Sequence, residues 1–233
     1  MTEFFTNHIS QGPDLSSFEQ MGLILLLLCF LFLSLKFYQK RWFRGLFYIL
    51  LAIQVVSLYT WHIVQSIPLF ESLPFYHCRL AILVLLFGKP GAIKRYFAYL
   101  GLFGSVLAFL HPVFDPYPFP HLTFFTYVVG HYALAVNALV YLLGEQSFEK
   151  LSLKQILSWT LLMNSVIFMV NVFTGGNYGF LSHLPLVNSQ EASLNFFVVN
   201  LGLVLAIEMT KWLFCLIGRN MKFLSYKNDF PSV

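Results

Sequence analysis

Long apolar runs alternate with short polar segments along the whole chain, and this pattern predicts an all-α polytopic membrane protein. A helix rises about 1.5 Å per residue, so about 20 apolar residues cross the hydrocarbon core of a bilayer. Seven runs approach or reach that length, at about residues 21–37, 46–67, 75–88, 96–110, 122–143, 156–173 and 194–217. The pattern therefore predicts seven transmembrane helices in a single domain over residues 1–233.

The runs at 75–88 and 96–110 are shorter than the others, so six spans are the main alternative to seven. Composition agrees with both counts. Hydrophobic residues make up 58% of the chain, charged residues 10%, and the mean hydropathy is +0.72. Because about a quarter of the residues in a soluble domain are charged, this composition excludes a soluble globular protein.

The basic residues test the predicted topology. If all seven runs cross, every Lys and Arg except Arg79 lies on one side of the membrane. The residues on that side are Lys36, Lys40, Arg41, Arg44, Lys89, Lys94, Arg95, Lys150, Lys154, Lys211, Arg219, Lys222 and Lys227. By the positive-inside rule this side is cytoplasmic, so we expect an outer N-terminus and a cytoplasmic C-terminus, with Glu71 and Asp115 outside.

The two ends of the chain carry no further domain signal. Residues 1–20 are polar and acidic and lack the features of a cleaved signal peptide, so we expect a short outer segment. Residues 220–233 are expected to form a cytoplasmic tail. The formal charge of +4 belongs to helix ends, which suits anionic lipid headgroups and not nucleic acid. Membrane lipids are the expected partners, and the sequence predicts no oligomeric state and no cofactor.

Three of the predicted spans carry polar stripes. Most polar or small residues of the 122–143 run are three, four or seven positions apart, which places them along one helical face. They are Thr123, Tyr127, Gly130, His131, Asn137, Ala138 and Tyr141. The other two stripes are Thr160, Asn164, Asn171 and Thr174, and Gln54, Ser57, Trp61 and Gln65. In lipid such stripes face other helices or a cavity, so we expect a pocket that opens outward.

Polar groups concentrate on the predicted outer side. Arg79 is the only cation expected there, and Tyr76, His77 and Cys78 precede it at the mouth of the third run. The linker "HPVFDPYPFPH" starts at His111 and contains Asp115; its prolines disfavour a regular helix, so we expect a stiff cap.

Cys78 and His131 are the candidate catalytic pair. A cysteine near a helix N-terminus and beside Arg79 is favoured as thiolate, and a histidine is a ready general base. A cysteine with a histidine is the minimum for nucleophilic acyl transfer. His131 as a purely structural residue is the alternative.

A metal or haem site at His77 and His111 is a less favoured alternative, because no two histidines lie at i, i+4 on one helix. The sequence therefore predicts no metal site. His62 and His183 lie near outer helix ends and are expected at the membrane interface.

Four segments resemble one family. "LPFYHC" (73–78), "HPVFDPYPFPH" (111–121), "YVVGHYALAV" (127–136) and "FTGGNYGFLSHLP" (173–185) are together similar to the YwaF-type family of bacterial membrane proteins, which is related to the eukaryotic transmembrane protein 164 acyltransferase. The resemblance covers most of the chain and implies a protein of the bacterial cytoplasmic membrane.

The resemblance also implies a chemistry. The eukaryotic relative moves a fatty acyl chain between phospholipids with a cysteine and a histidine, and its histidine falls on His131. Its cysteine aligns with Phe75, and the histidine that follows its cysteine aligns with Tyr76. The last residue of the bacterial pattern matches Cys78, which lies one helical turn from Phe75 and therefore on the same face.

Together these observations predict a membrane-embedded lipid acyltransferase. Cys78 carries the acyl chain as a thioester, His131 moves protons, and Arg79 holds a lipid phosphate. The other expected substrate-binding residues are Tyr76, His77, His111, Asp115, Tyr127, Asn164, Asn171 and Tyr178.

Two alternatives remain open. A lipid hydrolase would use the same residues. A small transporter, channel or sensor finds its best support in Glu208, an acid inside the last run, unless that acid simply pairs with Lys211 one turn away.

Overall fold

A computed structural model describes residues 3–144, 151–185 and 188–228. The described part is helical and contains no strand longer than an isolated bridge between Leu184 and Ser189. The elements are α1 (Ser17–Phe37), α2 (Arg41–Val64), α3 (Leu69–Ser72), α4 (His77–Phe87), α5 (Ala92–Leu110), α6 (Leu122–Gly144), α7 (Leu153–Thr174), the 3₁₀ turn η1 (Tyr178–Phe180) and α8 (Ala192–Asn228).

Six helices of the described chain are long and apolar enough to cross a membrane. They are α1, α2, α5, α6, α7 and α8 as far as Phe214. Large apolar side chains are exposed along these helices, as expected of a surface that faces lipid. Six of the seven expected spans are therefore confirmed, and the protein is a multi-pass membrane protein.

The third expected span corresponds to α4, which has only 11 residues. At about 1.5 Å per residue it covers roughly half of a hydrocarbon core of about 30 Å. Its C-terminal end nevertheless packs beside the N-terminal half of α2, where the hydroxyl of Tyr48 donates to the carbonyl of Leu86 at 3.1 Å. Just beyond α4, the amide of Gly91 donates to the hydroxyl of Tyr141, near the end of α6, at 3.1 Å.

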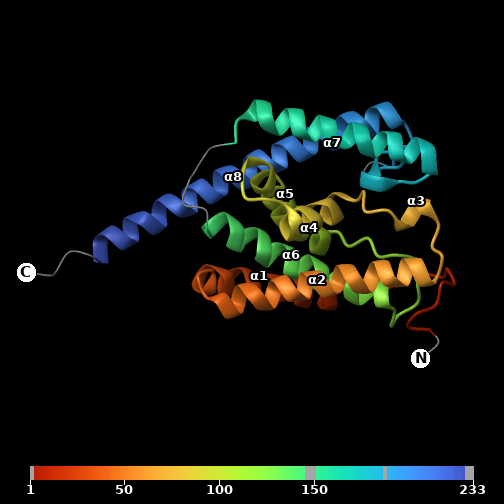
Figure 1. Cartoon of the computed structure of the whole chain (residues 1–233), viewed down its shortest axis with the longest axis horizontal. Coiled ribbons are helices and arrows are strands. Elements are labelled where there is room, and N and C mark those ends of the chain that lie inside the picture. Colours follow the sequence, from red (N-terminus) through yellow and green to blue (C-terminus); the bar gives the residue numbers. More distant parts are fainter. Residues whose placement is uncertain (1–2, 145–150, 186–187, 229–233) are drawn as a thin grey trace, which may run out of the picture.

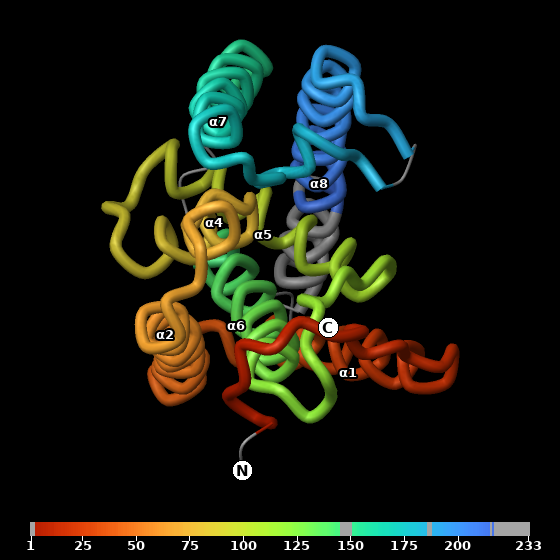
Figure 2. Tube along the Cα trace, turned by 90° about the vertical axis from the view of Figure 1, so that its right-hand side faces the viewer, coloured from red at the N-terminus to blue at the C-terminus, as the bar shows by residue number. Residues whose placement is uncertain are grey.

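The bundle has a centre and two flanks. In Figure 2, α7 and α8 lie side by side on one flank, α1 and α2 lie on the other, and α4, α5 and α6 lie between them. Figure 1 shows α8 extending beyond the bundle at the end opposite to the N-terminal segment. This arrangement surrounds the first turn of α4 with other helices.

Small residues let the central helices approach closely. A Cβ atom at Gly101 of α5 would lie 2.8 Å from the Leu134 Cδ1 of α6 and 3.3 Å from the Ala81 Cβ of α4. A Cβ atom at Gly130 of α6 would lie 3.0 Å from the side chain of Gln54 on α2. Close backbone approach at small residues is a common way for helices to pack in membranes, where lipid gives no hydrophobic drive.

The N-terminal segment covers the C-terminal end of α2 and the N-terminal end of α6. The indole of Trp61 donates to the carbonyl of Phe5 at 3.1 Å, and the amide of Leu122 donates to the carbonyl of Phe4 at 3.0 Å. His121 caps α6, because its Nδ1 accepts the backbone N–H of Thr123 at 3.2 Å. The proline-rich linker is thus packed under residues 4–12 and forms an ordered cap.

Candidate active site at the first turn of helix α4

The turn between α7 and α8 holds the chain that leads into α4. The Tyr178 hydroxyl donates to the carbonyl of Leu69 at 2.6 Å and accepts the amide N–H of Leu73 at 2.8 Å. Asn171 in turn binds the backbone of Tyr178 twice. Its Nδ2 donates to the Tyr178 carbonyl at 2.9 Å, and its Oδ1 accepts the Tyr178 N–H at 2.8 Å. Both residues are predicted at the substrate. In this structure their polar groups bond backbone and so position the residues before α4.

Cys78 lies in the first turn of α4, as expected, and points at α5. A Cβ atom at Gly104 would lie 2.8 Å from the Cys78 Sγ atom, which is well inside van der Waals contact. Only glycine at position 104 leaves room for the sulfur in this place. The thiol is half-buried and packs against the central core.

Helix register brings the candidate histidine toward the cysteine. Ala81, Gly101 and Leu134 meet where α4, α5 and α6 cross. Helix α5 runs antiparallel to α4 and α6. One turn closer to the N-terminal segment is therefore three residues later in α5 and three residues earlier in α4 and α6. The residues at that level are Cys78, Gly104 and His131. No hydrogen bond joins Cys78 to His131 in the described chain.

His131 has a defined tautomer. Its Nδ1 atom lies 2.7 Å from the backbone carbonyl of Tyr127, which can only accept, so Nδ1 carries the hydrogen. The Nε2 atom therefore carries the lone pair, and it makes no hydrogen bond to a described residue. Tyr127 packs its ring on the imidazole with centroids 4.3 Å apart and lies within electrostatic range of Cys78. The thiol and the imidazole that acyl transfer requires therefore lie at one level on α4 and α6. The basic nitrogen of the imidazole makes no hydrogen bond to a described residue.

Arg79 is held without a carboxylate partner. Its Nη1 atom donates to the carbonyls of Glu71 at 3.3 Å and Leu73 at 3.5 Å, and the guanidinium lies 4.9 Å from the ring centre of Tyr76. No carboxylate of a described residue lies within ion-pair distance of it. The Tyr59 hydroxyl also lies beside the guanidinium, so backbone, ring and hydroxyl contacts hold a positive charge that suits an anion.

Two acids, Glu71 and Asp115, lie near Arg79, and we call these three residues with Tyr117 the outer cluster. Burial, followed by the nearby Asp115, raises the pKa of the Glu71 carboxyl above its ordinary value. Burial also raises the pKa of Asp115, and the positive charge of Arg79 opposes that rise. Tyr117 donates its hydroxyl to Glu71 Oε1 at 3.2 Å. The pKa of both carboxyl groups is therefore raised even though the Arg79 charge acts against the rise.

Helix α2 contributes His62 to this cluster, and two turns earlier it carries Gln54 beside Gly130 of α6. His62 was expected at the membrane interface, but it is only 4% exposed and lies within electrostatic range of Arg79. Buried Nδ1 of His62 and buried Oε1 of Gln54 have no hydrogen-bond partner among the described residues. The two positions are eight apart and share one helix face, so the stripe that begins at Gln54 could have pointed to His62.

His77 faces the opposite flank. Its Nε2 atom lies 2.8 Å from Asn164 Oδ1 on α7, and Asn164 donates its Nδ2 to Asn200 Oδ1 on α8 at 3.0 Å. The two candidate residues His77 and Asn164 are thus in direct contact, and Asn200 is a member of the network that sequence reasoning missed. His111, by contrast, is exposed at the C-cap of α5. No group of three or more metal-ligating side chains occurs among the described residues.

A comparison with known protein families identifies the family of this chain. The model of the TMEM164 family matches residues 14–217, which is most of the chain. The chain belongs to the TMEM164 family. No curated protein and no solved structure matches it. The match spans α1 to the membrane part of α8, so the resemblance noted in the four sequence segments is confirmed at the level of the TMEM164 family.

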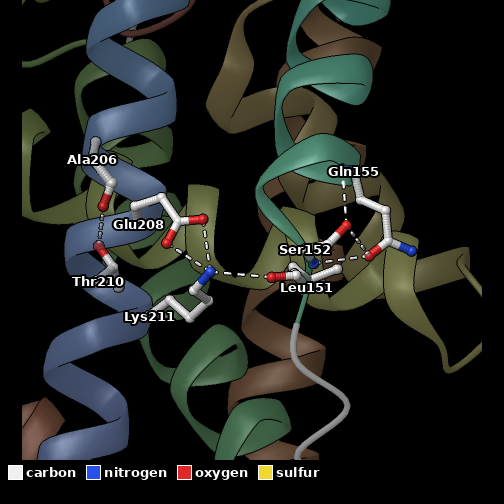
Figure 3. A network of polar contacts seen from close by, with 7 residues as sticks. All are labelled: Leu151, Ser152, Gln155, Ala206, Glu208, Thr210 and Lys211. Atoms are coloured by element: carbon white, nitrogen blue, oxygen red, sulfur yellow. Dashed lines mark hydrogen bonds and ion pairs between the residues drawn. The ribbon is translucent and has the colours of Figure 1, made fainter.

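Glu208, the strongest support for a transporter, is paired in this TMEM164-family protein. Lys211 Nζ lies 2.6 Å from both carboxylate oxygens of Glu208 and donates to the carbonyl of Leu151 at 3.1 Å. Figure 3 shows this network beside the Ser152 cap of α7. The simpler interpretation of Glu208, an i, i+3 ion pair, is confirmed. The pair joins α8 to the start of α7, and it provides no unpaired acid for an ion path.

Proposed function

We propose that this protein is a membrane-embedded lipid acyltransferase that works through a cysteine thioester at Cys78. The observation that carries the proposal is the level shared by three residues. Gly104 of α5 leaves room for the sulfur of Cys78 on α4. At the same level on α6, His131 has an Nε2 atom that makes no hydrogen bond to a described residue. Membership of the TMEM164 family supports the same assignment.

The proposed reaction has two balanced halves. His131 Nε2 accepts the thiol proton of Cys78, and the thiolate attacks the carbonyl carbon of a lipid ester. The C–O bond breaks, and the leaving alkoxide takes the proton from His131. In the second half a hydroxyl gives its proton to His131 and attacks the thioester, the C–S bond breaks, and the thiolate regains the proton. A small side-chain movement brings the sulfur and the imidazole together.

Arg79 is the proposed phosphate ligand. Guanidinium groups suit phosphate oxygens, and Arg79 has no carboxylate within ion-pair distance among the described residues. Tyr76 supports the guanidinium, the pKa values of Asp115 and Glu71 near it are raised by burial, and Tyr127 shields the imidazole. Because His111 is exposed, we propose that it contacts only the headgroup region.

The proposal includes a topology. We propose seven crossings with the N-terminus outside, in which α4 and the chain before it together form the third crossing. The hydrogen bond from Tyr48, in the N-terminal half of α2, to Leu86 supports this crossing. It places the end of α4 toward the end of the bundle that carries most Lys and Arg residues. The segment at 73–78 supports assignment to the YwaF-type bacterial subgroup and to the bacterial cytoplasmic membrane.

Intact mass of the protein purified from its own membranes tests the thioester directly. We expect an adduct of fatty-acyl mass that neutral hydroxylamine removes and that is absent from Cys78→Ser. Cys29→Ser is the matched control, because Cys29 is the exposed cysteine on α1 and lies outside the cluster. An adduct that disappears with Cys29 and persists in Cys78→Ser would overturn the proposal.

The acceptor separates transfer from hydrolysis. With the adduct loaded and a monoacyl phospholipid supplied, a transferase forms a diacyl lipid, whereas a hydrolase releases fatty acid. His131→Ala is expected to slow both formation and discharge of the adduct by at least about a hundredfold, in the range of a lost general base. An unchanged rate in that variant would remove His131 from the mechanism.

A further inference from the structure

The polar chain from α4 to α8 has only one consistent orientation. Asn200 Nδ2 lies 2.7 Å from the carbonyl of Phe196, and because that carbonyl can only accept, the amide orientation of Asn200 is determined. Its Oδ1 atom then accepts from Asn164 Nδ2 at 3.0 Å. Asn164 therefore presents its Oδ1 to His77 at 2.8 Å, and His77 must donate from Nε2. The lone pair of neutral His77 is confined to Nδ1.

The free nitrogen of His77 is accessible. Nδ1 makes no hydrogen bond within the described chain, and it is not among the buried unpaired polar atoms there. The ring is fixed from behind by Gly179, since a Cβ atom at that position would lie 2.9 Å from His77 Cε1. Gly179 has φ +63°, a conformation that favours glycine. The turn, Asn164 and Asn200 therefore hold one imidazole nitrogen as a hydrogen-bond acceptor that has no partner.

An apolar groove begins one helical turn from His77. It has a volume of about 280 Å³ and is lined by side chains of α4, α5 and α7. Leu80 lies one turn after His77 on α4, while Met163 and Ile167 flank Asn164 on α7, and all three line the groove. Ile167 also lies beside Gly179, the residue that packs on the His77 ring. A lipid chain in the groove would bring its polar end close to His77.

We infer that His77 is a specificity-determining residue that binds a lipid carrying a hydrogen-bond donor, with Asn164 and Asn200 as the positioning residues that keep Nδ1 an acceptor. The ligand's chain lies in the α4–α5–α7 groove. The donor is either a free glycerol hydroxyl or a headgroup N–H. As an account of substrate choice the inference rests on the proposed acyl transfer, but its binding test does not require catalysis.

Binding of four probes to the full chain in detergent, followed by native mass spectrometry, separates the two donor sources. The probes are monoacyl phospholipids with a free or an O-methylated glycerol hydroxyl, each with an ethanolamine or a choline headgroup. Loss of the relevant donor is expected to weaken binding about three- to tenfold, the effect of one neutral hydrogen bond. Weakening by the O-methyl group assigns the donor to the glycerol, and weakening by choline assigns it to the headgroup.

Variants test whether His77 is responsible. His77→Phe and Asn164→Leu are expected to abolish the preference, and Asn200→Ala provides a milder change if either variant fails to fold. Asn195→Leu is the matched control, because Asn195 is a fully buried amide of α8 that donates to the carbonyl of Ser189 at 3.1 Å. Nitrogen-15 spectra of the histidines report the tautomer separately. We expect His77 protonated at Nε2 and His131 at Nδ1, and mixed tautomers for His77 in Asn164→Leu.

Each outcome decides a separate claim. Equal binding of all four probes, a preference that survives His77→Phe, or a wild-type His77 protonated at Nδ1 would overturn the inference. An acyl adduct on Cys78 without any donor preference leaves the acyltransferase proposal intact and removes only the role of His77. A donor preference without any adduct supports the binding site and counts against the thioester.

Discussion

On the α7 side of α4, His77, Asn164 and Asn200 form an unbroken chain of hydrogen bonds, whereas on the α2 side the buried Oε1 of Gln54 and Nδ1 of His62 have no partner in the described chain. The first arrangement stabilises one geometry. The second leaves polar atoms desolvated without compensation, which costs free energy unless water or a ligand completes them. Helices α7 and α8 thus position the first turn of α4, while α2 carries the polar atoms at which we propose that the lipid headgroup binds.

The first prediction fills the space beside the cysteine. Gly104→Ala puts a methyl group within 2.8 Å of the Cys78 sulfur, so the thiol must move away from the level of His131. We expect the rate of acyl-adduct formation to fall at least about tenfold, which corresponds to about 1.4 kcal/mol. Single-turnover mass spectrometry measures it.

Gly202→Ala serves as the control for this change. Nothing lies within 4 Å of a Cβ atom at Gly202 on α8, so this variant should keep the wild-type rate. If Gly104→Ala also keeps that rate, the sulfur position in this structure is not the reactive one, and the contrast between the two sides of α4 loses its catalytic meaning.

The second prediction loosens the α7 side without touching the site. Tyr178→Phe removes the hydroxyl that serves Leu69 and Leu73, and it leaves a backbone N–H and a carbonyl unpaired. A loss of about 1–3 kcal/mol in the free energy of unfolding is expected. Denaturant unfolding in detergent measures it.

Tyr96→Phe offers the matched comparison. Tyr96 shares a hydrogen bond of 2.8 Å with Thr160, but Thr160 also donates to the carbonyl of Ile156, so less is left unpaired. Its cost should be smaller than that of Tyr178→Phe. A larger cost for Tyr96→Phe would mean that the turn at Tyr178 does not hold α4 in place.

The sequence was most informative about the elements and least informative about their contacts. Hydropathy predicted seven spans, and six of them are long helices, because lipid exposure requires continuous apolar runs. It began the fourth span at residue 96, whereas α5 begins at Ala92, because Lys94 and Arg95 interrupt the apolar run without interrupting the helix. Lys94 turns back to the carbonyl of Gly88 at 3.0 Å and so keeps its charge at the helix end.

The candidate site shows the same division. Residue type and depth selected Cys78 and His131, and a polar stripe selected Asn164. Neither could predict that His77 bonds Asn164, or that Asn200 completes the chain, because those pairings depend on how α4, α7 and α8 cross. The burial of His62 was missed for the same reason: its position near a helix end suggested the interface, and only packing of the N-terminal segment and linker over α2 encloses it.

The third prediction uses pH to examine the outer cluster. The pKa of Glu71 is raised above its ordinary value of 4.5, so the folded state binds the proton more tightly than the unfolded state. The stability that this proton confers is complete below the ordinary pKa and is lost as pH rises through the raised value. Glu71→Gln keeps an acceptor for Tyr117 and cannot ionise. It should therefore melt above the wild type at about pH 7.5 and together with it at about pH 4.

Glu208→Gln should behave in the opposite way at the higher pH. Glu208 is 31% exposed and paired with Lys211, so removing its charge brings no gain in melting temperature. If the two variants shift equally, the charge of Glu71 is solvated after all, and the outer cluster would not leave the charge of Arg79 available for phosphate.

The smallest expected effect separates the two sides most directly. Gln54→Leu removes a buried oxygen that has no partner, whereas Asn164→Leu removes an amide bonded at both ends. Replacing an unsatisfied group by an apolar one of similar size is nearly neutral, so Gln54→Leu should change the free energy of unfolding by no more than about 0.5 kcal/mol, while Asn164→Leu should cost about 1–3 kcal/mol. Lipid binding should respond in Gln54→Leu even though stability does not, because a ligand or its water is the group that would complete Oε1. Equal destabilisation by both substitutions would mean that Gln54 already has a permanent water partner. Gln54 would then be as fully bonded as Asn164, and the headgroup would have to bind elsewhere.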